Sequence, residues 1–324
     1  MDGRVVVVGS YNRDLVWEVD ALPAPGETRR GLRFRSGPGG KGMNQAIAAS
    51  RQGAATAFIG ATGADAFAAD LRALATAEGI EAWLETIADA STGTAAILVD
   101  AQGRNSIVVA LGANERLSVA HVEAQAPALR EAAVVLAPLE SPPEAVSRAF
   151  AIGRAAGART ILNPAPVHPG LDEDLLALAD LVTPNETEFA QLVSRFGGMA
   201  VDATRLASAT DEDLLTLCGR LPCAAVVLTL GAMGVFAAPG GREGGVLVRA
   251  ARVAAPRVAT VDTTGAGDAF NGALAAGWAG AVGASPSAAL VRAVQVASLS
   301  TERAGAALSM PQRSEVEARF PAAR

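Results

Sequence analysis

Short runs of apolar residues alternate with longer segments of helical periodicity along most of this chain. The first run, residues 4–9, is rich in valine and is typical of a buried strand. From residue 54 onward the two kinds of segment follow one another, which is the pattern of βαβ units. The strand-like runs lie at 133–139, 159–162, 181–183 and 224–230, and the helical patterns lie at 118–130, 143–157, 172–178 and 186–196. The pattern predicts an α/β fold with a mostly parallel central sheet and helices on both faces, and we expect residues 1–324 to form one domain.

Two segments depart from this pattern, because polar and apolar residues alternate in them with a period of two. They are residues 15–36, which contain a Pro-Ala-Pro-Gly turn, and residues 94–111. A period of two predicts strands with an exposed face. We expect these strands to pair into one small β-sheet that forms a lid over a pocket. Its half-apolar face predicts a homodimer, in which the second copy covers that face.

Composition narrows the classes of protein that fit. Half of the residues are hydrophobic and 19% are charged, which predicts a folded chain with a sizeable core. The net charge of −6 without a basic block argues against nucleic-acid or membrane-surface partners. The two cysteines and two histidines lack metal-ligand spacing, so no zinc site or Cys/His nucleophile is expected. With no signal-peptide pattern and no apolar stretch near 18 residues, we expect a cytoplasmic protein.

Polar residues that follow the predicted strands are the first candidates for a site, because ligands of parallel sheets gather at the carboxyl ends of the strands. Asn12 and Asp14 follow the first strand and project from the same face if the chain stays extended, although they also fit a plain polar loop. Glu140 follows a later strand. Ser141 and Glu144 predict a capping box for the next helix, which leaves Glu140 free for a ligand.

Two further strand ends have two interpretations each. Asn185 and Glu188 are either a helix-capping pair or ligand-binding residues. Gly231 and Gly234 form a tight turn that either brings the backbone close to phosphates or merely makes a hairpin. The pattern alone leaves both choices open.

A glycine-rich segment precedes a helix expected at 45–52. Its glycines match the G-x-G-x-x-G pattern of dinucleotide-binding proteins, but the preceding run is the lid segment and the next strand lacks the acid that would hold a ribose hydroxyl. The spacing around Lys41 also differs from a P-loop. The helix dipole disfavours a lysine near a helix start. We therefore expect the backbone, Lys41 and Asn44 to approach a small polar ligand; the alternative is a solvated lysine.

The segment 257–272 carries the strongest local signal of a site. An extended apolar run at 257–261 leads into small residues from Gly265 to Gly267, and a helix with an apolar face begins there. The free N–H groups of such a helix start can bind an anion. Asp268 lies in the first turn, where it is either an ordinary acid favoured by the helix dipole or a catalytic base beside a phosphate.

Taken in order, these motifs resemble the phosphofructokinase-B (PfkB) carbohydrate kinase family over nearly the whole chain, from residue 8 to about residue 311. Each motif is weak alone, but their order along the chain is specific. The motifs are Gly9-Ser10-Tyr11-Asn12-Arg13-Asp14, Pro25-Gly26-Glu27-Thr28, Gly39-Gly40-Lys41-Gly42-Met43-Asn44-Gln45, Leu139-Glu140-Ser141-Pro142, Asn163-Pro164-Ala165-Pro166, Thr183-Pro184-Asn185-Glu186-Thr187-Glu188 and Asp262-Thr263-Thr264-Gly265-Ala266-Gly267-Asp268.

The resemblance implies transfer of a phosphoryl group from ATP to a sugar hydroxyl, with Asp268 as the general base. It implies that the backbone of Gly265, Ala266 and Gly267 is the anion hole. The implied sugar-binding positions are Asn12, Asp14, Gly40, Lys41, Asn44, Glu140 and Asp268. The implied positions for ATP are Asn185, Glu188, Thr229, Gly231, Gly234 and Gly267, the first two also serving Mg²⁺. The implied positions of a monovalent-cation site, expected to hold K⁺, are Asp262, Thr264, Ser300, Arg303, Gly305 and Ser309.

The resemblance implies a pentose as the acceptor, and we expect D-ribose phosphorylated at its 5-hydroxyl. The implied pocket residues are polar and poor in aromatic residues, which favours a small free sugar over a nucleoside. The alternatives are deoxyribose, a nucleoside, a ketohexose derivative, or a non-catalytic sugar or nucleotide sensor. A sensor predicts loss of Asp268 or of the glycine turn, and both are present. Arg13 and Met43 replace small residues that are usual in the family. The sequence assigns neither an adenine pocket nor a role for residues 194–210.

Overall fold

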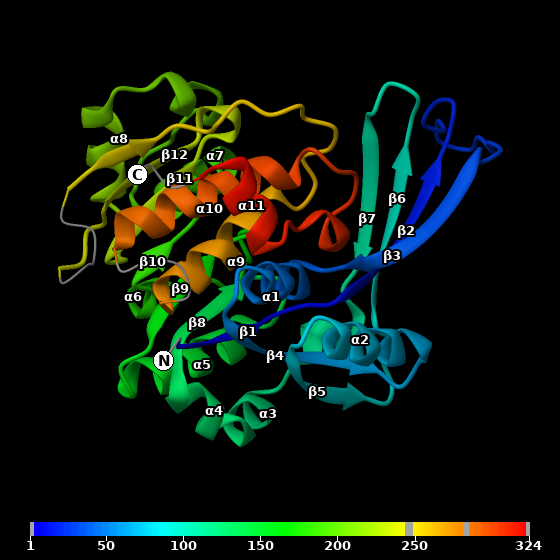
Figure 1. Ribbon diagram of the computed structural model, residues 1–324, viewed down its shortest axis with the longest axis horizontal. Coiled ribbons are helices and arrows are strands. Elements are labelled where there is room, and N and C mark those ends of the chain that lie inside the picture. Colours follow the sequence, from blue (N-terminus) through cyan, green and yellow to red (C-terminus); the bar gives the residue numbers. More distant parts are fainter. Residues whose placement is uncertain (1–2, 244–248, 281–284, 322–324) are drawn as a thin grey trace.

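The computed structural model describes residues 3–243, 249–280 and 285–321. Across these residues the strands form one nine-stranded sheet and a separate four-stranded sheet (Figure 1). The strands of the large sheet are β1 (Arg4–Val8), β4 (Ala55–Gly63), β5 (Glu81–Ile87), β8 (Ala132–Pro138), β9 (Arg159–Asn163), β10 (Leu181–Val182), β11 (Ala225–Thr229), β12 (Val235–Pro239) and β13 (Ala251–Val253). Their order is β13-β12-β11-β10-β9-β8-β1-β4-β5, and only the pairs that involve β12 are antiparallel.

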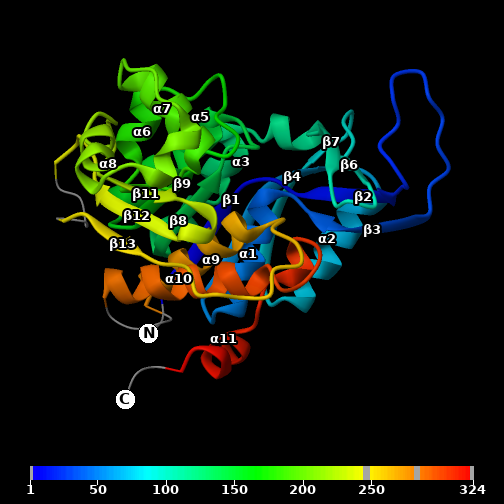
Figure 2. The same ribbon diagram turned by 90° about the horizontal axis from the view of Figure 1, so that it is seen from above.

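Helices cover both faces of this sheet, as the sequence predicted (Figures 1 and 2). Along β1, Val5 and Val7 face one buried cluster, and Val6 and Val8 face the other, because side chains alternate along a strand. The first cluster is covered by α1 (Lys41–Arg51), α2 (Ala66–Ala77), α9 (Ala266–Trp278), α10 (Pro286–Ser300) and α11 (Arg313–Arg319). The second is covered by α3 (Val119–Ala124), α4 (Ala126–Glu131), α5 (Pro143–Ala155), α6 (Glu173–Leu178), α7 (Glu186–Phe196) and α8 (Asp211–Cys218).

Helix α9 is enclosed on all sides, and from Asp268 to Trp278 every residue is buried. Glycines allow this enclosure because they let the neighbouring helices approach closely. A β-carbon at Gly272 would lie 2.3 Å from the Gln45 carbonyl oxygen on α1. A β-carbon at Gly277 would lie 2.7 Å from Ala289 on α10. The sequence predicted one apolar face on α9. Its small residues let neighbouring helices pack against the other faces, so these are buried as well.

The four-stranded sheet projects from the body as a lid (Figure 2). Its strands, in the spatial order β3-β2-β6-β7, are β3 (Arg33–Gly39), β2 (Asn12–Glu18), β6 (Gly93–Val99) and β7 (Asn105–Ala110). The two central strands are parallel, and the outer pairs are antiparallel. The predicted pairing of the two alternating segments into one small sheet is confirmed. Residues 19–32 form a loop, so strands occupy only the two ends of the first segment.

Several predicted boundaries change in the folded chain. Helix α1 begins at Lys41, four residues earlier than predicted, directly after Gly40. The single predicted helix at 118–130 is two helices, α3 and α4. The run 257–261 forms no strand, and Val261 is 68% exposed. Short 3₁₀ helices lie at η1 (Gly112–Arg116), η2 (Ala203–Ser208), η3 (Gly231–Met233) and η4 (Ala307–Ser309). Among the described helices, none has the length and apolar character needed to cross a membrane.

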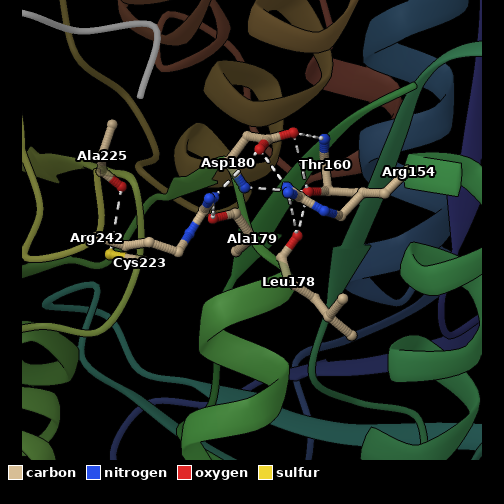
Figure 3. A network of polar contacts seen from close by, with 8 residues as sticks. All are labelled: Arg154, Thr160, Leu178, Ala179, Asp180, Cys223, Ala225 and Arg242. Carbon is tan, nitrogen blue, oxygen red and sulfur yellow. Dashed lines mark hydrogen bonds and ion pairs between the residues drawn. The ribbon is translucent and has the colours of Figure 1, made fainter. Parts of the chain in front are cut away.

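A polar network at the amino ends of the strands joins several elements far from the predicted site (Figure 3). The Asp180 carboxylate accepts from the Thr160 N–H at 3.0 Å and contacts the guanidinium groups of Arg154 and Arg242. The Thr160 hydroxyl donates to the Leu178 carbonyl at 2.6 Å. The network therefore fixes the end of α5, the start of β9, the end of α6 and the segment after β12 to one another.

Replacing Asp180 by alanine is expected to lower the free energy of unfolding by about 2–3 kcal/mol, because two guanidinium groups and one N–H lose their common partner. Urea denaturation measures this loss. Asp89 provides a matched control, since it pairs with Arg116 in an ion pair that is at least half exposed on both sides. Its replacement by alanine is expected to change stability by less than about 0.5 kcal/mol. Equal losses of stability from the two substitutions would contradict the role of Asp180 as the shared partner of the network.

Candidate active site

Asp268 lies in the first turn of α9, near the carboxyl ends of the central strands, and it is only 6% exposed. The helix starts after Gly265, whose φ of 77° is a left-handed conformation that glycine adopts without strain. Asn44 Nδ2 donates to Asp268 Oδ2 at 2.9 Å, and Gln45 Nε2 donates to Oδ1 at 3.0 Å. Each carboxylate oxygen thus accepts one amide hydrogen bond and retains a lone pair for another donor.

Two adjoining cavities meet at this helix start. The smaller has a volume of about 170 Å³, and Asp268 and Lys41 are among its lining residues. The larger has a volume of about 500 Å³. Thr229 and Gly267 line both cavities. A β-carbon at Gly267 would meet no atom within 4 Å, so this side of the turn faces open space. A group passing from one cavity to the other would move along the helix start beside Asp268.

The predicted sugar-binding residues gather where the lid joins the body. Asn12 begins β2, which confirms the extended conformation assumed for this segment. A β-carbon at Gly40 would lie 2.5 Å from the Asn12 nitrogen, and Gly40 has a φ of 86°, so only glycine fits there. The Glu140 carboxylate accepts from the Ser10 hydroxyl and, at 3.0 Å, from the Lys41 N–H. Glu140 therefore holds the start of α1 against the end of β1.

The capping box predicted beside Glu140 is wrong. Helix α5 starts at Pro143 with Pro142 at its N-cap and no side-chain capping bond, one residue later than the pattern assumed. Ser141 lies too early in the chain to cap the helix, and its buried hydroxyl has no hydrogen-bond partner. Glu140 was expected to be free, but it already accepts the two hydrogen bonds described above.

Asn114, which the sequence did not single out, fixes the orientation of Asn12. It is fully buried in η1, directly after the lid strand β7. Its Oδ1 accepts from the Tyr11 N–H at 3.0 Å, and its Nδ2 donates to the Tyr11 carbonyl at 3.0 Å and to Asn12 Oδ1 at 2.9 Å. Because Asn12 Oδ1 accepts from Asn114, this bond fixes which side of the Asn12 amide carries the oxygen and which carries the Nδ2 donor. No local pattern marks Asn114, since its partners lie about a hundred residues earlier.

Negative charge exceeds positive charge in this region. Burial alone would lower the pKa of Lys41, but the surrounding carboxylates outweigh burial and raise that pKa; they are Asp268, Glu140 and Glu188. Burial, followed by repulsion from Glu140, raises the pKa of Asp14 from 3.8 to about 6. Burial also raises the pKa of Glu188. The region is therefore suited to ligands that donate hydrogen bonds or bring cations.

Replacing Asp14 by asparagine is expected to stabilise the ligand-free protein at pH 7.5. The folded-state pKa of Asp14 lies above its unfolded value, so the folded state binds more protons between pH 3.8 and about 6, and stability falls as the pH rises through this range. The shift of about 2 units corresponds to at most about 3 kcal/mol. Urea denaturation at pH 7.5 and 4.5 tests this; a gain of equal size at both pH values would contradict it.

The residues predicted to bind ATP also lie close together in the folded chain. Asn185 Oδ1 accepts from the Glu188 N–H, and Glu188 Oε2 accepts from the Asn185 N–H, both at 2.9 Å, so the predicted capping box of α7 is confirmed. Both residues also line the smaller cavity, and their ligand role stays a prediction. Asn185 pairs with Thr229 through an isolated bridge. Gly231 begins η3 between β11 and β12, Gly234 directly follows η3, and both line the larger cavity.

The far wall of the larger cavity could not be assigned from the sequence. Part of it comes from the irregular segment at 255–260, which overlaps the apolar run at 257–261. The rest comes from Thr263, from α9, and from α10 with Thr301 directly after it. The lining residues from these parts are Ala255, Pro256, Arg257, Val258, Thr260, Thr263, Ala266, Phe270, Val294, Ala297, Ser298 and Thr301.

Of the predicted cation-site residues, Thr264 and Gly305 contact the carboxylate of Asp262. This carboxylate accepts from the Thr264 N–H and hydroxyl and from the Gly305 N–H at 2.8 Å, and these bonds lower its pKa although burial opposes them. The Arg303 side chain instead pairs with Glu315. The hydroxyls of the two predicted serines donate to carbonyls three residues earlier in their own segments; they are Ser300 and Ser309.

A parallel α/β sheet with a buried aspartate at a glycine-started helix, between two adjoining cavities, has the architecture of a small-molecule kinase. The sequence model of the pfkB family carbohydrate kinases matches residues 2–313. The chain belongs to this family.

Individual relatives agree with this assignment. The chain is 36% identical over 315 residues to a ribokinase of Bacillus subtilis, covering 97% of this chain and 98% of that protein. It is also 36% identical to a ribokinase of Haemophilus influenzae, covering 84% of each chain. The structure of an Arabidopsis thaliana ribokinase complexed with ribose and ATP has a TM-score of 0.82 and 29% identity, covering all of both chains.

Proposed function

We propose that this chain is an ATP-dependent ribose kinase, which transfers the γ-phosphoryl group of ATP to the 5-hydroxyl of D-ribose. The observation that carries the proposal is the buried Asp268 carboxylate at the start of α9, where the two cavities adjoin. The identity to ribokinases over nearly the whole chain supports ribose as the acceptor.

In the proposed reaction, Asp268 takes the proton of the sugar hydroxyl while the hydroxyl oxygen attacks the γ-phosphorus. The bond from this phosphorus to the oxygen bridging the β-phosphate breaks, its electron pair leaves with ADP, and the sugar phosphate forms. The N–H groups around Gly265 and Gly267 stabilise the transferring group, each worth about 2.7–4 kcal/mol by analogy with oxyanion holes. The lid excludes water, so that ATP is not simply hydrolysed.

Mg²⁺ would supply positive charge to the ATP phosphates, and Glu188 and Asn185 would hold it from the wall of the smaller cavity. Within the described residues there is no cluster of three or more His, Cys, Asp or Glu side chains able to hold a metal ion. Phosphate oxygens and water would complete the ligand set, which suits Mg²⁺. A monovalent cation, K⁺ in our proposal, would be held beside Asp262, whose carboxylate stays ionised at neutral pH.

A coupled assay of ADP release tests the proposal across D-ribose, 2-deoxy-D-ribose, a nucleoside and a ketohexose, in potassium chloride and in tetramethylammonium chloride. We expect the highest kcat/KM with D-ribose and a loss of rate without potassium. Turnover with another acceptor but not with ribose would overturn the choice of substrate. Ribose binding without turnover would instead indicate a sensor. Equal rates in both salts would contradict the proposed role of the monovalent cation.

We also propose that the protein is a homodimer, in which the second copy covers the half-apolar face of the lid. Residues paired across adjacent strands point to the same side, so the register places Ile107 and Val109 on the lid face that carries Asp14. Ile107 is 49% exposed and Val109 is 44% exposed. An apolar face that continues from the site and lies open in the single chain supports burial against a second copy.

Replacing Ile107 by aspartate is therefore expected to shift the protein from dimer to monomer, measured by light scattering at working concentration. Val108 provides the matched control, because it is 69% exposed and lies in the same strand but on the opposite face. Its replacement by aspartate is expected to leave the dimer intact. A wild-type monomer, or a dimer broken only by the Val108 variant, would contradict this interface.

A further inference from the structure

Gln45 is fully buried on α1 and contacts the proposed base directly. Its Nε2 lies 3.0 Å from Asp268 Oδ1 and 3.0 Å from Asn163 Oδ1, so both of its hydrogens are used. Asn163 in turn donates through Nδ2 to the backbone carbonyl of Thr183 at 3.0 Å. A continuous chain of hydrogen bonds thus runs from the end of β10 through β9 and α1 to Asp268.

The Thr183 carbonyl, at one end of this series of hydrogen bonds, fixes the direction of every bond in the series. The Thr183 carbonyl can only accept, so Asn163 must turn its Nδ2 toward it and its Oδ1 toward Gln45. Gln45 must then present Nε2, because the opposite orientation would place three acceptor oxygens together. The second Nε2 hydrogen is thereby aimed at Asp268. The Gln45 Oε1 atom is buried without a hydrogen-bond partner, which shows that the two donor bonds determine the orientation.

A second branch ties the same strand end to the helix start. The Thr183 hydroxyl contacts Asn271 Oδ1 at 2.6 Å, and Asn271 Nδ2 donates to the Gly267 carbonyl at 2.8 Å. Thr183 therefore holds both Asp268, through Asn163 and Gln45, and the turn before Asp268, through Asn271. The close approach of α1 and α9 at Gly272 brings Gln45 within reach of Asp268.

We propose that Gln45 is a positioning residue for phosphoryl transfer, which orients the Asp268 carboxylate and stabilises its negative charge through a donor set by Asn163 and Thr183. This inference rests on the proposed role of Asp268 as the base. A neutral amide suits the task, because it donates without neutralising the carboxylate as a cation would. The charged groups that interact with Asp268 are Lys41, Asp14 and Glu188, and Glu140 acts in turn on Lys41 and Asp14.

The first test replaces Gln45 by methionine, which keeps the volume and removes both donors. We expect kcat to fall by about 10–100-fold, as for lost partners that orient catalytic ligands. The KM for the sugar should stay within about threefold, since the sugar contacts remain. The acid limb of the pH profile of kcat should move to higher pH. Gln52 is the matched control: it is equally buried at the end of the same helix, its Oε1 also lacks a partner, and its Nε2 donates to the Pro311 carbonyl at 2.9 Å.

The Gln52→Met variant should lose comparable stability but keep the wild-type pH profile, which separates a positioning role from a structural one. A second variant, Gln45→Glu, keeps the shape and adds a titratable group. When protonated it can still donate to Asp268, and when ionised it repels Asp268. The ratio of its kcat to the wild-type value should therefore rise as the pH falls.

Asp268→Asn is assayed in parallel with the preferred sugar. If it is inactive while Gln45→Met has the wild-type kcat and pH profile, this inference is overturned and the proposed function stands. If Asp268→Asn is fully active, the base assignment and this inference fail together. A Gln45→Glu activity ratio that does not change with pH also overturns the inference, even where Gln45→Met does not fold.

Discussion

Replacing Asp268 by asparagine is expected to lower kcat with the preferred sugar by about 10²–10⁴-fold, because asparagine keeps the shape of the side chain but cannot accept the hydroxyl proton. The KM for ATP should change little, since the larger cavity is untouched. Steady-state ADP release at saturating substrates measures the effect. The amide nitrogen would face the donors of Asn44 or Gln45, so the melting temperature is recorded alongside.

The control addresses the plainest alternative, that Asp268 is only a helix-start acid. Glu144 is such an acid, exposed in the first turn of α5 and outside the two cavities. Its replacement by glutamine should leave kcat within about twofold, as for a surface substitution. Full activity of Asp268→Asn would refute the mechanism.

Other carboxylates near the site are poorly placed to act as the base. Glu140 already accepts from the Ser10 hydroxyl and the Lys41 N–H. Glu188 is held in the capping box of α7 with Asn185. These contacts fix the ends of helices, whereas both hydrogen-bonding partners of Asp268 are side chains that orient it and leave lone pairs free.

The general position of the site could be predicted because it depends on topology more than on detail. In a parallel sheet the carboxyl ends of the strands meet at one edge, so Asn12, Glu140 and Asn185 had to converge once the strands were recognised. The lid could be predicted for a similar reason, because a period of two fixes which side chains share a face. Small errors in strand boundaries changed neither conclusion.

What the sequence could not show depends on contacts between distant segments. In the sequence, Gln45 is simply one polar residue in a predicted helix. Its hydrogen-bond partners, Asn163 and Asp268, lie 118 and 223 residues further along the chain. The run 257–261 looked like a strand because a segment that lines a cavity can be as apolar as a sheet segment. The predicted capping box at Ser141 was wrong because α5 begins one residue later than expected. A motif shows that a helix start is near but does not fix the exact first residue.

Lys41 differs from every other basic residue in the chain, because it is the single lysine among 27 lysine and arginine residues. Surface pairs use arginine throughout, as in Arg29 with Asp20 or Arg116 with Asp89. Lys41 instead lines the smaller cavity, among carboxylates that raise its pKa, so it is charged at neutral pH. A cavity of about 170 Å³ suits a compact ammonium group better than a planar guanidinium.

We propose that the Lys41 ammonium, besides its implied place in the sugar site, donates to the transferring phosphoryl group, because it lines the same small cavity as Gly267 and Asp268. Replacing Lys41 by methionine is therefore expected to lower kcat by about 10²–10³-fold, comparable to the loss of one donor to a developing anion. Lys41→Arg keeps the charge but enlarges the head group, and it should also lose at least about tenfold because the transferring group and the guanidinium compete for one space. Arg30→Met, at an exposed position of the lid loop, is the control and should have the wild-type kcat. A fully active Lys41→Arg would show that charge alone matters at this position, and a fully active Lys41→Met would show that the ammonium group takes no part in the transfer.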